Sequence, residues 1–245
     1  MLLVVLADDA FVFMVAWELM SLASYFLVAF QHESAANRRA AFLYLLMAHL
    51  GGLAILLGFG VLAAFGHSFE FAAMRTAPLS SGWASIAFML AFIGFGMKAG
   101  LVPLHAWLPE AHPAAPSHIS ALMSGVMLKV AVYGFIRVVF DLIGQFQWQW
   151  GVTLIVIGSL SALMGVLFAL MQTDLKRLLA YSSVENLGII FIALGWHWYF
   201  SAPAIHCSAH WLLLRRSITA SITHYSKVCC FLAQAQFCTA PTNAI

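Results

Sequence analysis

Residues 94–137 read GFGMKAGLVPLHAWLPEAHPAAPSHISALMSGVMLKVAVYGFIR, and this stretch decides the fold. An apolar run stands at each end, and a segment rich in proline and histidine separates the two. The runs extend over residues 84–102 and 118–140, close to the ~20 residues that a helix needs to cross a bilayer. Because the apolar residues follow one another without alternation, we expect membrane-spanning helices and not the strands of a barrel.

The same pattern recurs on both sides of this stretch, in four further apolar runs at 9–30, 40–65, 150–171 and 177–195. The chain is 63% hydrophobic and only 8% charged, whereas a soluble domain carries about 25% charged residues. So few charges cannot cover a water-facing surface. We therefore predict an integral, all-α protein of the lipid bilayer, a polytopic transmembrane helix bundle with about six spans.

The sequence predicts neither nucleic-acid binding nor a cleavable signal peptide. A net charge of +2 provides no basic field for binding nucleic acid. The opening MLLVVLADDAFVF lacks a basic n-region, so we expect no cleavable signal peptide.

The basic residues of the connections predict an orientation. Two connections lie on the same side of the membrane, because an even number of predicted spans separates them. Both carry basic pairs, which are Arg38 with Arg39 and Lys176 with Arg177. The connection at 66–83 has only Arg75, and the one at 141–149 has no Lys or Arg. The positive-inside rule then puts the basic pairs and the segment 103–118 on the cytoplasmic side of the cell inner membrane. Arg137, near the outer end of its span, is a mild exception.

Four ionisable residues lie inside the predicted spans: Glu18, Lys98, Lys129 and Glu185. A charged side chain at the centre of a spanning helix costs roughly 2.5–3.5 kcal/mol on insertion scales, so such residues usually face the bundle interior and mark a pathway. Structural alternatives stay open. The lysines could snorkel to the interface, Glu18 could form a purely structural ion pair, and Glu185 could only pin a neighbouring helix.

The span that carries Lys98 is interrupted, because Gly100 and Pro103 follow the lysine closely. Broken helices tend to occur beside ion sites in membrane proteins, although the helix could simply end here. Three histidines follow the break, at His105, His112 and His118. They could relay protons or anchor the segment at the interface. Spacings of seven and six residues do not place them on one helix face, so we predict no metal site.

These residues resemble a known family. Together with WELMSLASYFLV at 17–28 and DLKRLLAYSSVENLG at 174–188, the stretch 94–137 resembles the proton-antiporter-like subunits of complex I, Mrp antiporters and membrane-bound hydrogenases. The resemblance covers residues 1–195. Within the family, the sequence of these motifs is most similar to that of the large membrane subunits of formate hydrogenlyase and of hydrogenase-4, the type called component B.

The resemblance implies a fold and a set of roles. The fold would be the first of two inverted five-helix repeats, with a broken helix near 98–105. Glu18 would pair with Lys98, and Lys129 would exchange protons with that pair. Glu185 and Asn186 stand where many complex I subunits have a Ser-His pair, which leaves the role at that position open.

The function implied is proton translocation by a non-redox subunit of an oxidoreductase complex, such as a hydrogenase or an NADH:quinone oxidoreductase. The expected partners are other membrane subunits and a peripheral electron-transfer arm, and no cofactor is expected on this chain. Two alternatives remain: a sodium/proton antiporter subunit, and a structural fragment without transport.

The last fifty residues differ in character, and we expect residues 196–245 to be an aberrant tail read in a displaced frame. All four cysteines lie at or after Cys207. The family continues with a helix like N-H-A-L-F-K-S-L-L-F. Joining the third base of each codon to the first two bases of the next lets residues 220–232 decode as LNHALFKSLLFL. A genuine divergent tail is the alternative.

Overall fold

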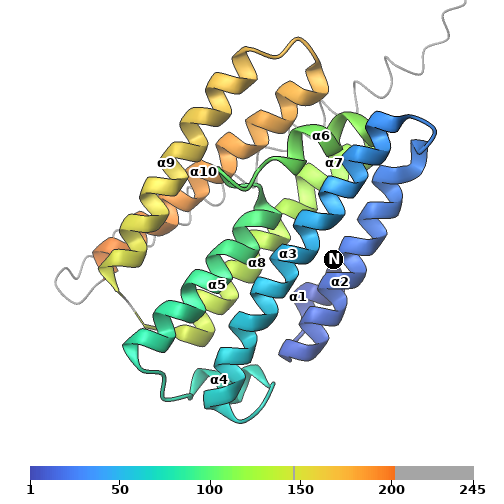
Figure 1. Ribbon diagram of the computed structural model, residues 1–245. Helices are drawn as coiled ribbons and strands as arrows, with labels where there is room; N and C mark the ends of the chain where they lie inside the picture. Colours follow the sequence, from blue (N-terminus) through green and yellow to red (C-terminus); the bar gives the residue numbers. More distant parts are fainter. Residues whose placement is uncertain (146, 202–245) are drawn as a thin grey trace, which may run out of the picture.

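The computed structural model describes residues 1–145 and 147–201, and residues 202–245 of the predicted tail at 196–245 lie outside this range. Over the described residues the chain forms helices and no strand, apart from one isolated bridge between Asp9 and Glu70 (Figure 1). The predicted all-α class is therefore confirmed. The long helices outside the 117–143 region are α2 (Ala10–Val28), α3 (Ala35–Gly66), α5 (Ser81–Ala99), α9 (Trp148–Leu170) and α10 (Leu175–Ser201). The short ones are α1 (Leu2–Leu6), η1 (Ala29–Gln31), α4 (Phe71–Arg75) and α6 (Trp107–Ala114).

The five long helices are each long and apolar enough to cross a membrane, and each overlaps a predicted span. The remaining predicted span, 118–140, has a different construction. It is a succession of four helical segments without a gap: α7 (Ser117–Leu122), η2 (Met123–Met127), α8 (Leu128–Ile136) and η3 (Arg137–Ile143). Both η2 and η3 are π-helical. π-Helical turns inside α-helices are rare and often occur at functional sites.

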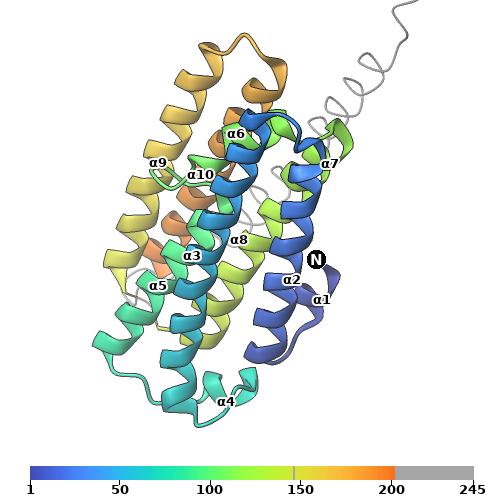
Figure 2. The same ribbon diagram turned by 45° about the vertical axis from the view of Figure 1, so that its right-hand side comes forward.

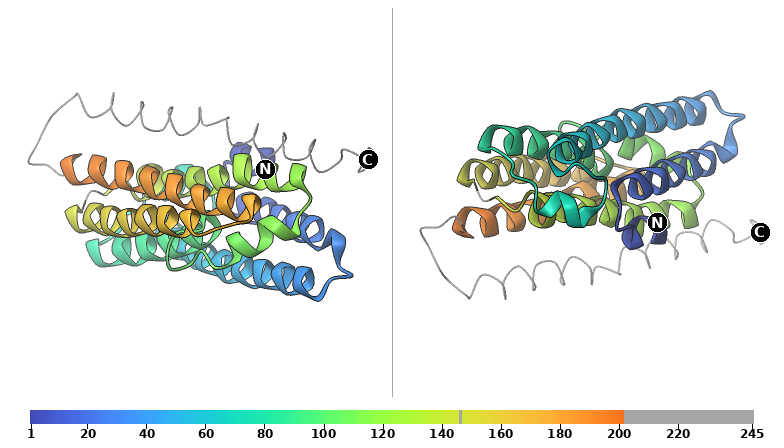
Figure 3. Two further views of the ribbon diagram at one scale, coloured as in Figure 1. Left: turned by 90° about the horizontal axis from the view of Figure 1, so that it is seen from above. Right: turned by 90° about the horizontal axis from the view of Figure 1, so that it is seen from below.

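The long helices run side by side (Figures 1 and 2). Helices α2, α3, α5 and α8 form one group, and the α9–α10 hairpin packs along it, as the views from above and below in Figure 3 also show. Aromatic side chains join the hairpin to the group. The rings of Phe88 on α5 and Trp150 on α9 stack with centroids 4.6 Å apart, and the rings of Phe135 on α8 and Phe191 on α10 lie 5.2 Å apart.

Glycines set the close helix contacts within each part. A Cβ atom on Gly94 of α5 would stand 2.7 Å from the carbonyl oxygen of Gly51 on α3. A Cβ atom on Gly188 of α10 would stand 2.6 Å from the carbonyl oxygen of Gly158 on α9. Small residues at such crossings let membrane helices approach until their backbones touch, which increases the van der Waals contact that holds them together.

The connections sort to the two ends of the bundle. The α2–α3 turn, the α6–α7 segment and the α9–α10 turn lie at one end, and α4 lies at the other (Figure 1). The basic pairs at 38–39 and 176–177 thus share an end, as parity requires. Which end faces the cytoplasm stays a prediction.

Candidate functional site

The predicted helix break is present, one residue after Lys98. Helix α5 ends at Ala99, and Gly100 adopts the left-handed conformation with φ 79°. The backbone N–H groups of Gly100 and Leu101 both bond back to the carbonyl oxygen of Gly96, at 2.9 and 3.0 Å. Glycine suits this position because it adopts positive φ without a Cβ penalty.

Side chains from outside the break satisfy backbone groups that the missing helix turn leaves free. The N–H of Val102 donates to Oγ of Ser161 on α9 at 3.0 Å. The indole Nε1–H of Trp107 donates to the carbonyl oxygen of Met97 at 2.8 Å. In a bilayer such groups need partners within the protein, so these two bonds make an interrupted helix tolerable inside a membrane-spanning bundle.

Lys98 is almost completely buried, with 2% of its surface exposed. Its Nζ donates to the hydroxyl oxygens of Ser21 on α2, at 2.9 Å, and of Tyr44 on α3, at 2.8 Å. The ammonium nitrogen also lies 4.8 Å from the centroid of the Tyr44 ring and 5.9 Å from that of Trp17. The lysine points into the protein, so snorkelling to the interface does not describe it.

Glu18 lies on α2, one turn before Ser21, but forms no ion pair with Lys98 in the part of the chain that is described. Its carboxylate instead lies 3.9 Å from Nε2 of His49 on α3. A Cβ atom on Gly52 would collide with the Glu18 carboxylate oxygen, so this glycine provides room for the side chain. The pairing of Glu18 with Lys98 that the resemblance implies stays a prediction.

Lys129 is half-buried on α8, and its Nζ donates to the carbonyl oxygen of Ser124 at 3.0 Å. Ser124 belongs to the π-helical segment η2, where the backbone departs from the regular α-helical pattern. The Ser124 hydroxyl in turn lies 2.9 Å from that of Ser183 on α10, and Ser183 donates to the carbonyl oxygen of Leu179. A chain of polar groups thus joins Lys129 to α10.

The three predicted histidines occupy three different environments. His112 is fully buried on α6, and its Nδ1 shares a hydrogen bond with the hydroxyl of Ser120 on α7. His105 is half-buried in the break, with its ring 6.4 Å from that of Tyr181 on α10. His118 is exposed. The three histidines therefore need not share one role. Because His112 is the buried one, it is the candidate for a proton relay.

Glu185 is half-buried on α10, where its backbone packs against Gly165 of α9. A Cβ atom on that glycine would stand 2.7 Å from the Glu185 nitrogen. The start of α10 also holds the segment after the break. Lys176 Nζ donates to the carbonyl oxygen of Ala115 at 3.0 Å, and Arg177 pairs with Glu110 of α6 at 3.5 Å. The α9–α10 hairpin therefore supports the broken helix from the side.

A second set of charges lies at the opposite end of the bundle. Arg75 on α4 donates to both carboxylate oxygens of Asp141 at 2.7 Å, and Arg137 contacts Asp141 at 3.2 Å and Asp8 at 3.3 Å. Asp141 lies just beyond the predicted span 118–140. The Arg75 guanidinium, with Arg137 nearby, holds the pKa of Asp141 below its usual range.

The predicted residues do not include the serines and the tyrosine that lie near the two lysines. The hydroxyls of Ser21 and Tyr44 accept from Lys98, and the Ser161 hydroxyl accepts from the backbone at the break. The carbonyl oxygen of Ser124 accepts from Lys129, and the Ser124 hydroxyl bonds to that of Ser183. A hydroxyl inside an apolar span is a weak signal, because serine and threonine commonly bond to the carbonyl four residues earlier in their own helix. Only the position of Ser21, one turn after Glu18, could have drawn attention to it.

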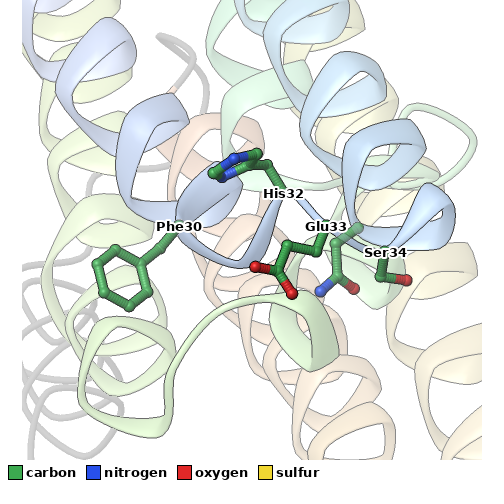
Figure 4. Close-up of a pocket in the computed structure, with 5 residues that line it drawn as sticks. Phe30, His32, Glu33 and Ser34 are labelled. Carbon is green, nitrogen blue, oxygen red and sulfur yellow. The ribbon is translucent and has the colours of Figure 1, made fainter.

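A cleft of about 420 Å³ opens away from the lysines, at the connection between α2 and α3 (Figure 4). Its lining residues are Phe30, His32, Glu33, Ser34 and Asn37. None of the predicted site residues is among them, so the arrangement of buried charges remains the candidate site.

Comparison with known proteins supports the resemblance seen in the sequence. The family described as NADH:quinone oxidoreductase/Mrp antiporter, transmembrane region, matches residues 7–222, and so extends past the expected boundary at residue 195. Hydrogenase-4 component B of Escherichia coli is 50% identical over 198 residues, which are 80% of this chain and 29% of that protein. NADH-quinone oxidoreductase subunit M of Escherichia coli is 32% identical over 222 residues, covering 85% of this chain and 43% of that protein.

The fold comparison agrees. In the structure of the Mrp complex from Dietzia sp. DQ12-45-1b, one chain superposes with a TM-score of 0.74 at 27% sequence identity. The match covers 96% of this chain and 24% of that one. The chain therefore spans less than half the length of each of these relatives.

Proposed function

Because the chain belongs to the NADH:quinone oxidoreductase/Mrp antiporter transmembrane family, we propose that it carries protons across the cell inner membrane as one subunit of an electron-transfer complex. The 50% identity to hydrogenase-4 component B favours a hydrogenase as that complex. Electron transfer is assigned to partner subunits, in particular a peripheral arm. Proton movement through the bundle is the part assigned to this chain.

The observation that carries the proposal is the burial of Lys98 beside a broken helix. The residue is 2% exposed. Its ammonium group donates hydrogen bonds to neutral hydroxyls and lies near aromatic rings, and the Glu18 carboxylate attracts it only from a distance. Holding a charge in this way is costly in a membrane, and intramembrane ionisable groups of this kind mark ion and proton pathways. A lysine whose charge is poorly compensated can release and rebind a proton when its neighbours move.

A second lysine, Lys129 on the neighbouring helix α8, supports a proton path through the bundle over a single isolated site. Lys129 has its own polar contacts, to Ser124 and onward to Ser183 on α10. His112 and Ser120 add a buried pair on the segment that follows the break. The proposed path therefore uses Glu18, Lys98 and Lys129 as proton-exchanging groups, with the buried histidine as a relay.

The test is proton flux through the chain reconstituted in liposomes. A potassium gradient with valinomycin imposes a membrane potential, and a pH-sensitive dye inside the vesicles reports proton entry. We expect flux above that of empty vesicles, lost in both Lys98→Ala and Lys129→Ala. Arg39→Ala removes an exposed charge near the start of α3, outside the predicted span 40–65, and is the matched control, expected to behave like the native chain.

The outcomes separate the proposal from its alternatives. Flux that requires a sodium gradient would support a sodium/proton antiporter subunit instead. Native flux no greater than that of the two lysine variants would overturn transport by this chain and favour a structural role.

A further inference from the structure

We propose that Tyr44, together with Ser21, is a positioning residue that gives the Lys98 head group a binding place separate from Glu18. The inference rests on the proposed function, which it deepens by naming the groups that hold this lysine between transfers. In the structure the ammonium nitrogen contacts the two hydroxyl oxygens at 2.8 and 2.9 Å and is not ion-paired with Glu18 within the described residues.

The hydrogen bonds of the two hydroxyls show that both oxygens are free to accept from the lysine. Ser21 donates its own hydrogen to the carbonyl oxygen of Trp17 at 3.0 Å, so its lone pairs face Lys98. The Tyr44 hydroxyl also interacts with the hydroxyl of Ser24, and its hydrogen can reach the carbonyl oxygen of Ser21 at 3.5 Å or Sδ of Met127 at 3.6 Å. Since an ammonium group is a pure donor, two acceptors on one side form a place built to receive it.

The second binding place is the Glu18 carboxylate. It lies close enough to the two hydroxyls for the Lys98 side chain to alternate between the two places. Glu18 and Ser21 are three residues apart on α2, so their side chains are neighbours about 5–6 Å apart at Cβ. The lysine stem is flexible, with four methylene groups. In one place the Glu18 carboxylate would contact the charge directly, whereas in the other neutral dipoles hold it and Glu18 attracts it only from a distance. Moving between them changes how readily Lys98 gives up its proton.

Tyr44 also connects this place to the helix of the second lysine. Its hydroxyl contacts Sδ of Met127, the last residue of the π-helical segment η2 and two residues before Lys129. Ser24 reaches the same sulfur at 3.5 Å. The hydroxyl place therefore lies where the helices of Glu18, Tyr44 and Lys129 meet.

Tyr44→Phe is a precise test, because it removes the hydroxyl and keeps the ring, which packs 5.1 Å from that of Trp107. We expect proton flux in liposomes to fall about tenfold, the effect of losing a hydrogen bond to a charged group. Ser21→Ala should also slow flux, and Ser21→Thr, which keeps a hydroxyl, should restore it. Tyr25→Phe, a half-buried tyrosine on α2 that does not contact Lys98, is the control and should leave flux unchanged.

The results distinguish this inference from the proposed function. If Lys98→Ala abolishes flux and Tyr44→Phe retains the native rate, the positioning role is wrong while proton transport stands. Equal loss of flux in Tyr44→Phe and Tyr25→Phe would likewise contradict a specific role for the Tyr44 hydroxyl.

A spectroscopic readout tests the geometry even if the native chain shows no flux. The chain has four lysines, Lys98, Lys129, Lys176 and Lys227, so their ¹⁵Nζ signals in solid-state NMR can be assigned by single substitution. Tyr44→Phe should shift the Lys98 signal and leave that of Lys129 in place. An unmoved Lys98 signal in a variant that melts like the native chain would overturn the inference.

Discussion

Replacing Gly94 with alanine tests the contact that brings α3 and its Tyr44 against α5 and its Lys98. Gly94 lies one turn before the lysine. An added Cβ atom would stand 2.7 Å from the carbonyl oxygen of Gly51, 3.0 Å from the backbone nitrogen of Ile55 and 2.5 Å from Cγ1 of that isoleucine. The first two are backbone atoms, which cannot move aside by a simple side-chain rotation. The two helices must therefore separate.

The expected magnitude follows from two opposing terms. Overpacking of this kind costs about 1–3 kcal/mol, and the backbone contacts favour the upper half of that range. Alanine stabilises a helix by ~0.8–1.0 kcal/mol relative to glycine, which offsets part of the cost. The net loss in the free energy of unfolding is then about 1–2 kcal/mol. At roughly 2–4 °C per kcal/mol for a chain of this size, the melting temperature should fall by about 2–8 °C.

The assay is thermal unfolding of the purified chain in a mild detergent, followed by circular dichroism. Gly60→Ala on α3 is the matched control, because nothing lies within 4 Å of the position of its Cβ atom. That variant should melt at or slightly above the native temperature. A Gly94→Ala protein that melts at the native temperature or higher would refute the reasoning, since it would show that α3 and α5 are not in backbone contact there.

Two further predictions concern the helix break and the opposite end of the bundle. Ser161→Ala leaves the buried N–H of Val102 without its acceptor, so we expect a loss of about 1–3 kcal/mol in stability and faster hydrogen exchange of the Val102 amide. Unchanged exchange there would contradict the assigned bond. Because Arg75 holds the pKa of Asp141 below its usual range, the folded state is favoured above the ordinary pKa near ~3.9, and this contribution is lost as pH falls through the lower folded value. The melting temperature of the native chain should therefore fall more steeply with acidification below about pH 4 than that of Asp141→Asn, and parallel curves would contradict the ion pair.

Most of the fold could be predicted because a bilayer imposes strong rules on sequence. A helix that crosses it must be apolar over a fixed length, and five of the six predicted spans correspond to single long helices. The break after Lys98 could be predicted for the same reason, since Gly100 and Pro103 interrupt a pattern that otherwise has to continue. The π-helical segments at Met123–Met127 and Arg137–Ile143 have no such signature.

The sequence by itself determined the class of the protein, the positions of its spans and the few charges worth attention, because burying a charge in lipid is so costly that each one is conspicuous. Only the tertiary structure decided what those charges contact. Lys98 reaches hydroxyls on two other helices, 77 and 54 residues away in the chain, and its pairing with Glu18 stays a prediction. The physical reason is that helix packing, set by contacts such as Gly51 with Gly94, fixes which side chains meet across a bundle. Spacing along the chain specifies neighbours only within a single helix.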